Sequence, residues 1–214
     1  MKNHQIRVDF SLQLTSSQKQ KIDFLLEFFK PYTRNIYIVG GFLRDNILGI
    51  YSDDIDIELY DIDATLFYQL MKELNATELS KEFFAYCYDG IDILLPRIEI
   101  KTATGYHGFK MTQTNDPFLA TQRRDFTINT LMYHLGEKKL YDFCNGYSDL
   151  QNKILRVVNT ENFYEDNVRF LRAIRFMNKY HLKPDKETQK ILLSMTLQDI
   201  TKTKIEKELK KIFL

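Results

Sequence analysis

The feature that most constrains the fold of this chain is an apolar run that passes directly into two glycines. Residues Ile36–Val39 have the pattern of a short buried strand, Gly40 and Gly41 follow at once, and a helical stretch continues to Leu48. A glycine turn between a strand and a helix exposes backbone N–H groups that can bind a phosphate. Arg44, one turn into the helix, can add a charge-assisted hydrogen bond to it. The segment therefore predicts an α/β unit with an anion site at the turn.

The densest chemistry lies in Asp53–Glu58, where acidic and apolar residues alternate as in a half-buried strand. Side chains i and i+2 of a strand share a face, so Asp54 and Asp56 project together and repel each other unless a cation lies between them. Hard oxygen ligands at this spacing suit Mg²⁺. Asp92, which follows the hairpin turn predicted at Asp89-Gly90, is placed to complete a two-metal site. A solvated acidic edge strand is the alternative, and the glycine turn upstream favours the metal site.

Two arginines and an aspartate precede a second apolar run. Arg123 and Arg124 suit a phosphate, and Asp125 suits a ribose hydroxyl pair because a carboxylate only accepts hydrogen bonds. These residues alone are equally consistent with an exposed helix start that Asp125 caps.

A helix predicted over residues 162–180 carries a stripe of arginines. At 100° per residue, Arg169, Arg172 and Arg175 lie on one side, with Asp166 three residues before the first of them. The stripe is either a strong anion site or a solvated face. An aspartate–arginine pair presents fixed acceptors and donors, which can read the Watson–Crick edge of a base without a nucleic-acid template.

Near residue 142 the sequence changes from mixed strand and helix patterns to mainly helical periodicity, which predicts an α/β head over 1–142 and an all-helical segment over 143–214. Residues 151–214 carry 14 Lys and Arg against 8 Asp and Glu, whereas residues 1–150 carry 16 against 21. An acidic first part and a basic second part fit a metal-binding head joined to an anion-binding arm.

No apolar run is long enough for a membrane span and the start is polar, so we expect a cytoplasmic protein that contacts no membrane. Further helices are predicted over 16–30, 64–74, 185–195 and 203–214.

Together these segments resemble a known group: the class II tRNA nucleotidyltransferases, or CCA-adding enzymes, and the bacterial poly(A) polymerases of the polymerase-β-like superfamily. The resemblance covers about residues 35–214. It rests on four segments in order, which are VGGFLRD with LG and DxD (residues 39–56), RRDFTIN (123–129), Asp142 with Gly146, Asp149 and Leu150, and EDxxRxxRxxR (165–175). Two departures are Ile50, where the family usually has arginine, and Thr130, where it usually has alanine.

The resemblance implies an α/β (α+β) polymerase-β-like nucleotidyltransferase head with an all-helical neck. It implies addition of CMP and AMP, from CTP and ATP, to the 3′ acceptor end of tRNA, with Mg²⁺ as cofactor and pyrophosphate as product. Poly(A), CC-only and A-only addition remain open, as do a non-catalytic RNA- or nucleotide-binding module and a homodimer. The implied metal ligands are Asp54 and Asp56, grouped with Asp92 as catalytic carboxylates. The nucleotide is expected among Gly40, Gly41, Arg44, Arg124, Asp125, Asn129, Asp166, Arg169, Arg172 and Arg175.

Overall fold

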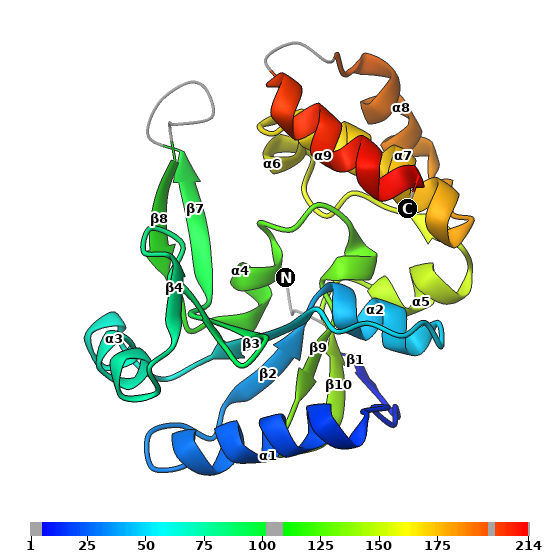
Figure 1. Cartoon of the computed structure of the whole chain (residues 1–214). Coiled ribbons are helices and arrows are strands. Elements are labelled where there is room, and N and C mark those ends of the chain that lie inside the picture. Colours follow the sequence, from blue (N-terminus) through cyan, green and yellow to red (C-terminus); the bar gives the residue numbers. More distant parts are fainter. Residues whose placement is uncertain (1–5, 102–108, 197–199, 214) are drawn as a thin grey trace.

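The computed structural model describes residues 6–101, 109–196 and 200–213, which form a mixed sheet with helices on both faces (Figure 1). The sheet has eight strands in the order β1-β10-β9-β2-β3-β6-β5-β4. β3 and β6 run parallel, and the other neighbours in this sheet are antiparallel. The strands are Ile6–Val8 (β1), Ile36–Val39 (β2), Ile55–Leu59 (β3), Thr77–Ser80 (β4), Ala85–Tyr88 (β5), Ile91–Leu94 (β6), Met132–His134 (β9) and Lys139–Asp142 (β10).

One face of this sheet is covered by α1 (Ser16–Phe29) and α3 (Ala64–Glu73), which bury the largest apolar cluster of the chain against β2, β3 and β6. Alternation in β3 sends Ile55 and Ile57 into this core and turns Asp56 and Glu58 to the opposite face. The candidate site therefore lies on the face of the sheet away from α1 and α3.

Several local predictions are confirmed at their capping and turn residues. The helices predicted over 16–30 and 64–74 are present as α1 and α3, and the Asp63 carboxylate caps α3 by accepting the Leu66 N–H. α1 begins with a capping box of Thr15 and Gln18, which was not predicted. Asp89 and Gly90 join β5 to β6 with positive φ angles of 49° and 79°, as a tight hairpin turn requires.

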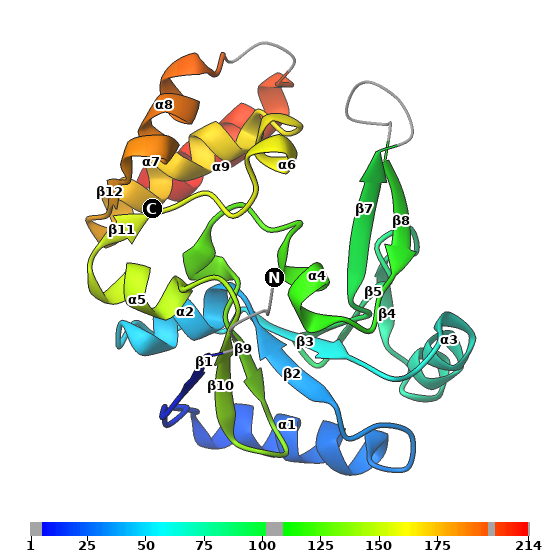
Figure 2. The same cartoon turned by 180° about the vertical axis from the view of Figure 1, so that it is seen from behind.

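The remaining elements include an arm and a helical segment, which both rise from the side of the sheet away from α1, at its two ends (Figures 1 and 2). The arm is the antiparallel pair β7 (Arg97–Lys101) and β8 (Phe109–Gln113). The other elements are α2 (Gly41–Ile47), α4 (Pro117–Thr121), a 3₁₀ turn (Thr127–Asn129), α5 (Gly146–Gln151), β11 (Ile154–Leu155), α6 (Thr160–Tyr164), α7 (Val168–Tyr180), β12 (Lys183–Pro184), α8 (Lys186–Ser194) and α9 (Lys202–Phe213). Among the helices of the described residues, none has the length and apolarity that crossing a membrane requires.

The continuous helix predicted over residues 162–180 is wrong. α6 ends at Tyr164 and α7 begins at Val168, because Asp166 accepts the backbone N–H of Val168 at 3.1 Å and so begins a new helix. The helical neck also contains the short parallel pair of β11 and β12. The boundary predicted near residue 142 stays a prediction. β10 ends at Asp142, yet Phe126 and Ile128 share a core cluster with α6, α7 and α8.

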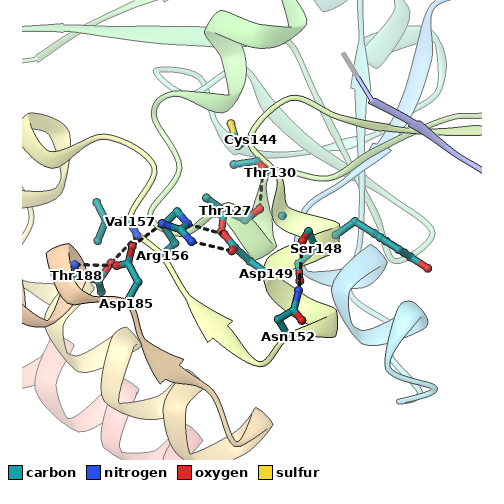
Figure 3. Close-up of polar contacts among 12 residues, drawn as sticks. Thr127, Thr130, Cys144, Ser148, Asp149, Asn152, Arg156, Val157, Asp185 and Thr188 are labelled. Atoms are coloured by element: carbon teal, nitrogen blue, oxygen red, sulfur yellow. Dashed lines mark hydrogen bonds and ion pairs between the residues drawn. The ribbon is translucent and has the colours of Figure 1, made fainter. Parts of the chain in front are cut away.

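A polar network joins the head to the helical segment (Figure 3). Arg156 donates two hydrogen bonds to the Asp149 carboxylate, at 3.0 and 3.2 Å, and another to Asp185. Asp149 also accepts the Thr127 hydroxyl at 2.7 Å, and Asp185 accepts the N–H of Thr188 at the start of α8. One arginine therefore ties the 3₁₀ turn, α5 and α8 together.

Candidate active site

A cavity of about 650 Å³ lies between the open face of the sheet, the arm and the α7–α9 pair. Its walls come from β3, the β2–α2 turn, the segment around Arg123–Asn129, β7, α7 and α9. Figures 1 and 2 show the arm and the α7–α9 pair on the same side of the sheet, away from α1. Of the predicted site residues, the cavity is lined by Gly40, Gly41, Arg44, Asp54, Asp56, Arg124, Asp125, Asn129, Asp166, Arg169, Arg172 and Arg175.

The acidic side of the cavity is the beginning of β3. Asp54 is exposed and Asp56 is half-buried. The pKa of Asp56 is raised to about 7, chiefly by burial and then by the Asp54 charge, while Arg124 opposes both. Asp92 stands beside Asp56 in the parallel register of β3 and β6, but it is not among the described residues that line the cavity. The structure therefore brings the three carboxylates together at the neighbouring starts of β3 and β6, and two of them, Asp54 and Asp56, line the cavity.

Asp54 and Asp56 fit a divalent metal ion. Both supply hard oxygen donors toward the cavity, and their like charges, held close, require a cation between them or a proton. Within the described residues, no group of three or more His, Cys, Asp or Glu side chains is arranged to hold a metal by itself. Water and phosphate oxygens are the ligands that Mg²⁺ commonly adds to one or two carboxylates.

The glycine turn lies directly beside these carboxylates, because Val39 pairs with Asp56 across β2 and β3. Gly40 has a φ of +77°, which side-chain-bearing residues rarely adopt. A Cβ there would also lie 3.4 Å from the Arg124 guanidinium and 3.8 Å from the Asp56 carboxylate. These are ordinary van der Waals distances, so the backbone angle and not a lack of space is what favours glycine at this position.

Arg44 lines the cavity, but its side chain is buried and its hydrogen bonds go to the protein. Its Nε donates to Asp45 at 2.8 Å and its Nη1 donates to Asn129 at 2.6 Å. Its guanidinium also lies over the rings of Phe176 and Tyr180, at 5.0 and 4.5 Å from their centroids. The predicted phosphate contact of Arg44 stays a prediction, and the structure shows that the side chain braces α2 against α7.

Glu58 is a site residue that the sequence analysis missed. Its side chain is fully buried, one oxygen accepts from Arg123 and Arg124 at 3.0 Å each, and the other accepts the Tyr60 hydroxyl at 2.9 Å. Burial alone would raise the pKa of Glu58, but the two guanidinium groups outweigh it and hold the pKa below its usual value. The signal was present, because Glu58 follows Asp56 by two residues on the same face of the strand.

Asp125 connects the second arginine motif to α7. One oxygen accepts the Phe126 N–H and the Asn129 amide, both at 2.8 Å, and the other accepts the Arg172 Nε at 2.6 Å. Burial would raise its pKa, but Arg172 and Asn129 lower it to about 2. Both oxygens thus have protein partners, so the ribose contact predicted for Asp125 and the nucleotide contact predicted for Asn129 stay predictions.

The arginine stripe of α7 faces the cavity and is not a solvated surface. Arg169 donates to the backbone carbonyl of Arg123 at 2.8 Å, and Arg175 donates to Glu208 on α9 at 2.9 Å. The side chain of Arg175 is only 11% exposed. Asp166 also lines the cavity, at the break between α6 and α7, which places it beside the first arginine of the stripe.

The sequence analysis also missed residues from two elements that approach the cavity from its sides. The arm contributes Arg97 and Glu99, which carry no motif. α9 contributes a face whose signal is a helical spacing of charged residues, namely Lys204, Lys207, Glu208 and Lys211.

Residues 36–156 match the family described as the poly(A) polymerase head domain. The chain belongs to this family. It is 36% identical over 148 residues to the multifunctional CCA protein of Xanthomonas campestris pv. campestris, which covers 66% of this chain and 34% of that protein. It is 32% identical over 167 residues to the A-adding tRNA nucleotidyltransferase of Geobacter sulfurreducens, which covers 73% of this chain and 19% of that protein.

Solved structures of the same family confirm the predicted polymerase-β-like head fold. An apo form of a CCA-adding enzyme matches with a TM-score of 0.78 and 28% identity, over 94% of this chain and 50% of that one. The Thermotoga maritima CCA-adding enzyme complexed with tRNA matches with a TM-score of 0.75 and 27% identity, over 94% and 48%. The chain spans about half the length of these structures and about a third of the first curated relative.

Proposed function

We propose that this chain carries the catalytic centre of a template-independent tRNA nucleotidyltransferase, which adds CMP and AMP from CTP and ATP to tRNA 3′ ends and releases pyrophosphate. One observation carries the proposal: a single cavity has the Asp54 and Asp56 pair on one wall and the Asp166, Arg169 and Arg172 helix on another. A phosphate-activating centre and a base-reading surface are the two parts that such a reaction needs.

Asp54 and Asp56 are the residues that would hold Mg²⁺. When bound, the metal supplies Lewis-acid stabilisation of the triphosphate charge and lowers the pKa of the attacking 3′-hydroxyl. The protein contributes orientation, because both carboxylates start a strand whose neighbouring isoleucines are locked in the core. Asp92 adds negative charge from the adjacent strand.

The nucleotide is proposed to lie between the glycine turn and α7. Gly40 and Gly41 allow close approach of phosphate to the backbone, and Arg124, held by Glu58, offers a fixed guanidinium next to them. Asp166 and Arg169 are proposed to select the base by hydrogen bonds to its Watson–Crick edge. In support, structures of a CCA-adding enzyme with CTP and with ATP match this chain with TM-scores of 0.72 and 0.71 at 28% identity.

A-only addition is the second candidate, since the relative from Geobacter sulfurreducens is an A-adding enzyme and its match covers 73% of this chain. A non-catalytic RNA-binding module is disfavoured by the acidic pair. A protein that only binds polyanions gains nothing from two adjacent carboxylates in its cavity.

The test is incorporation of each labelled nucleoside triphosphate into two RNAs, one ending at the discriminator base and one ending in CC. CCA addition predicts CMP on the first RNA and AMP on the second, whereas A-only addition predicts AMP on the second alone. Asp54→Ala should abolish the signal, while Asp53→Ala, which changes an exposed neighbouring carboxylate, should keep it. The proposal fails if the wild-type chain extends neither RNA with any of the four nucleotides.

A further inference from the structure

One face of α9 forms a basic side of the cavity, and none of the sequence motifs includes its residues. Lys204, Lys207 and Lys211 follow one another by three and four residues, and all three line the cavity. This spacing places them on one side of the helix, which packs along α7 (Figures 1 and 2). Lys202 and Lys210 on the same helix are exposed and are not among the described residues that line the cavity.

The arginines of the cavity are largely compensated by carboxylates of the protein. Arg124 is paired with Glu58, Arg172 with Asp125 and Arg175 with Glu208, at 3.0, 2.6 and 2.9 Å. Each of these carboxylates is buried. The positive charge of these three arginines is therefore largely neutralised by ion pairs within the protein, which connect the walls of the cavity.

Lys207 and Lys211 on α9 are compensated less. The Lys211 Nζ lies 3.8 Å from Glu208, whose other oxygen already accepts from Arg175. Burial lowers the pKa of Lys211, Glu208 raises it, and the neighbouring cations Arg175 and Lys207 lower it again. One carboxylate thus faces several cations, and the surplus of positive charge in this part of the cavity lies on α9.

We infer that the Lys207 and Lys211 face of α9 binds the phosphate backbone of the RNA 3′ strand where it enters the cavity. The inference rests on the proposed function, and it names a contact surface for the RNA. Lys207 is exposed and the Lys211 side chain is 48% exposed, so both reach solvent where a strand can pass. A lysine amine is a flexible point charge that suits a phosphate in any base sequence.

The position of the Asp54 and Asp56 pair argues against a nucleoside triphosphate as the ligand of the α9 lysines. The groups that fit a metal, and hence a triphosphate, are Asp56 on β3 and Asp54 just before it, whereas the lysines belong to α9. A polymer that enters past α9 and ends at β3 contacts both walls at once.

The experiment compares two double variants with the same charge change on the same helix. Lys207→Gln with Lys211→Gln alters the cavity face, and Lys202→Gln with Lys210→Gln removes two exposed lysines that do not line the cavity. The probe is a fluorescent acceptor-stem minihelix, whose Kd is measured by anisotropy without nucleotide between about 50 and 300 mM KCl. Because each phosphate contact contributes about 0.7–0.9 to the slope of log Kd against log salt, the cavity-face variant should lose about 1.5 of slope. That loss corresponds to about 30-fold weaker binding at 0.1 M salt.

The Lys202 and Lys210 double variant should bind the minihelix within about threefold of wild type, and both double variants should keep the wild-type Kd for CTP. Equal weakening by both double variants would show a mere effect of net charge and would overturn the inference. A loss of CTP affinity with unchanged RNA binding would overturn it as well, because the lysines would then bind a triphosphate.

Two further variants guard against misfolding. Lys207→Arg with Lys211→Arg keeps the charge and should bind RNA about as tightly as wild type. Lys207→Gln alone should lower the salt slope by about half as much as the double glutamine variant does. Since binding is measured without turnover, a chain that adds no nucleotide but shows lysine-dependent binding would refute only the proposed function. A chain that adds nucleotides with unchanged binding in the cavity-face variant would refute only this inference.

Discussion

Replacing Asp125 with asparagine should loosen the connection between the sheet and α7. The carboxylate is 6% exposed, accepts the Phe126 N–H and the Asn129 amide on one oxygen, and accepts the Arg172 Nε at 2.6 Å on the other. An asparagine keeps the shape of the side chain but removes its charge. It also presents an amide N–H₂ where the protein supplies only donors.

The magnitude follows from the lowered pKa of Asp125. A shift from the ordinary value of 3.8 to about 2 corresponds to about 2 kcal/mol of native-state stabilisation. The donor facing a donor adds about 1–2 kcal/mol, so we expect Asp125→Asn to lower the free energy of unfolding by about 3–4 kcal/mol. For a domain of this size, that lowers the Tm by about 6–16 °C.

The sign of the pH dependence is fixed because the pKa is lower in the folded chain than in the unfolded one. The charge contribution is present in full above the ordinary value of 3.8 and is lost as the pH falls toward about 2. At pH ~3 about half of it should remain. The difference in unfolding free energy between wild type and Asp125→Asn should therefore narrow as the pH is lowered from about 5 to about 3.

Urea unfolding at three pH values measures this difference, and Asp63→Asn is the matched control. Asp63 is exposed and accepts only the Leu66 N–H as the cap of α3, where asparagine serves about as well as aspartate. The control should cost less than about 0.5 kcal/mol. A pH-independent difference, or a cost for Asp125→Asn no larger than the control, would refute the argument that the Asp125–Arg172 pair stabilises the fold.

Three further outcomes are expected. Asp54→Ala and Asp56→Ala should each lower nucleotide incorporation by at least ~10³-fold with an unchanged Tm, and a near-normal rate in either would exclude it as a metal ligand. Arg169→Ala should raise UTP and GTP incorporation relative to CTP, since a bidentate base contact is worth about 1–3 kcal/mol, and an equal loss for all four nucleotides would point to a phosphate or structural role. Glu58→Ala removes a fully buried carboxylate that two partly buried guanidinium groups contact, and it should cost about 3–5 kcal/mol in urea unfolding. The exposed Glu78, which accepts only the Tyr86 hydroxyl, should cost less than about 1 kcal/mol when changed to alanine, and similar costs would contradict the anchoring role of Glu58.

The sequence by itself determined the elements whose signals are local. The strand before Gly40, the Asp63 cap and the Asp89-Gly90 turn follow from backbone preferences and hydrogen bonds within a few residues, and the structure has all of them. The alternation around Asp56 likewise determined which side chains enter the core, because the period of a strand is fixed. The break between α6 and α7 was not predicted, because the helical periodicity of the sequence continues through it. It forms because the Asp166 carboxylate accepts the Val168 N–H in place of a helical hydrogen bond.

Only the tertiary structure decided which polar groups are left for a ligand. Residue type and spacing marked Arg44 and Asp125 as ligand contacts, yet their hydrogen bonds go to Asn129, 85 positions away from Arg44, and to Arg172, 47 positions away from Asp125. The same holds for Glu58, which two arginines 65 and 66 positions away turn into a buried anchor. Hydrogen-bond capacity is a property of the residue, but its use depends on which chain segments meet. The packing of α7 and α9 over the sheet settles that, and no local pattern encodes it.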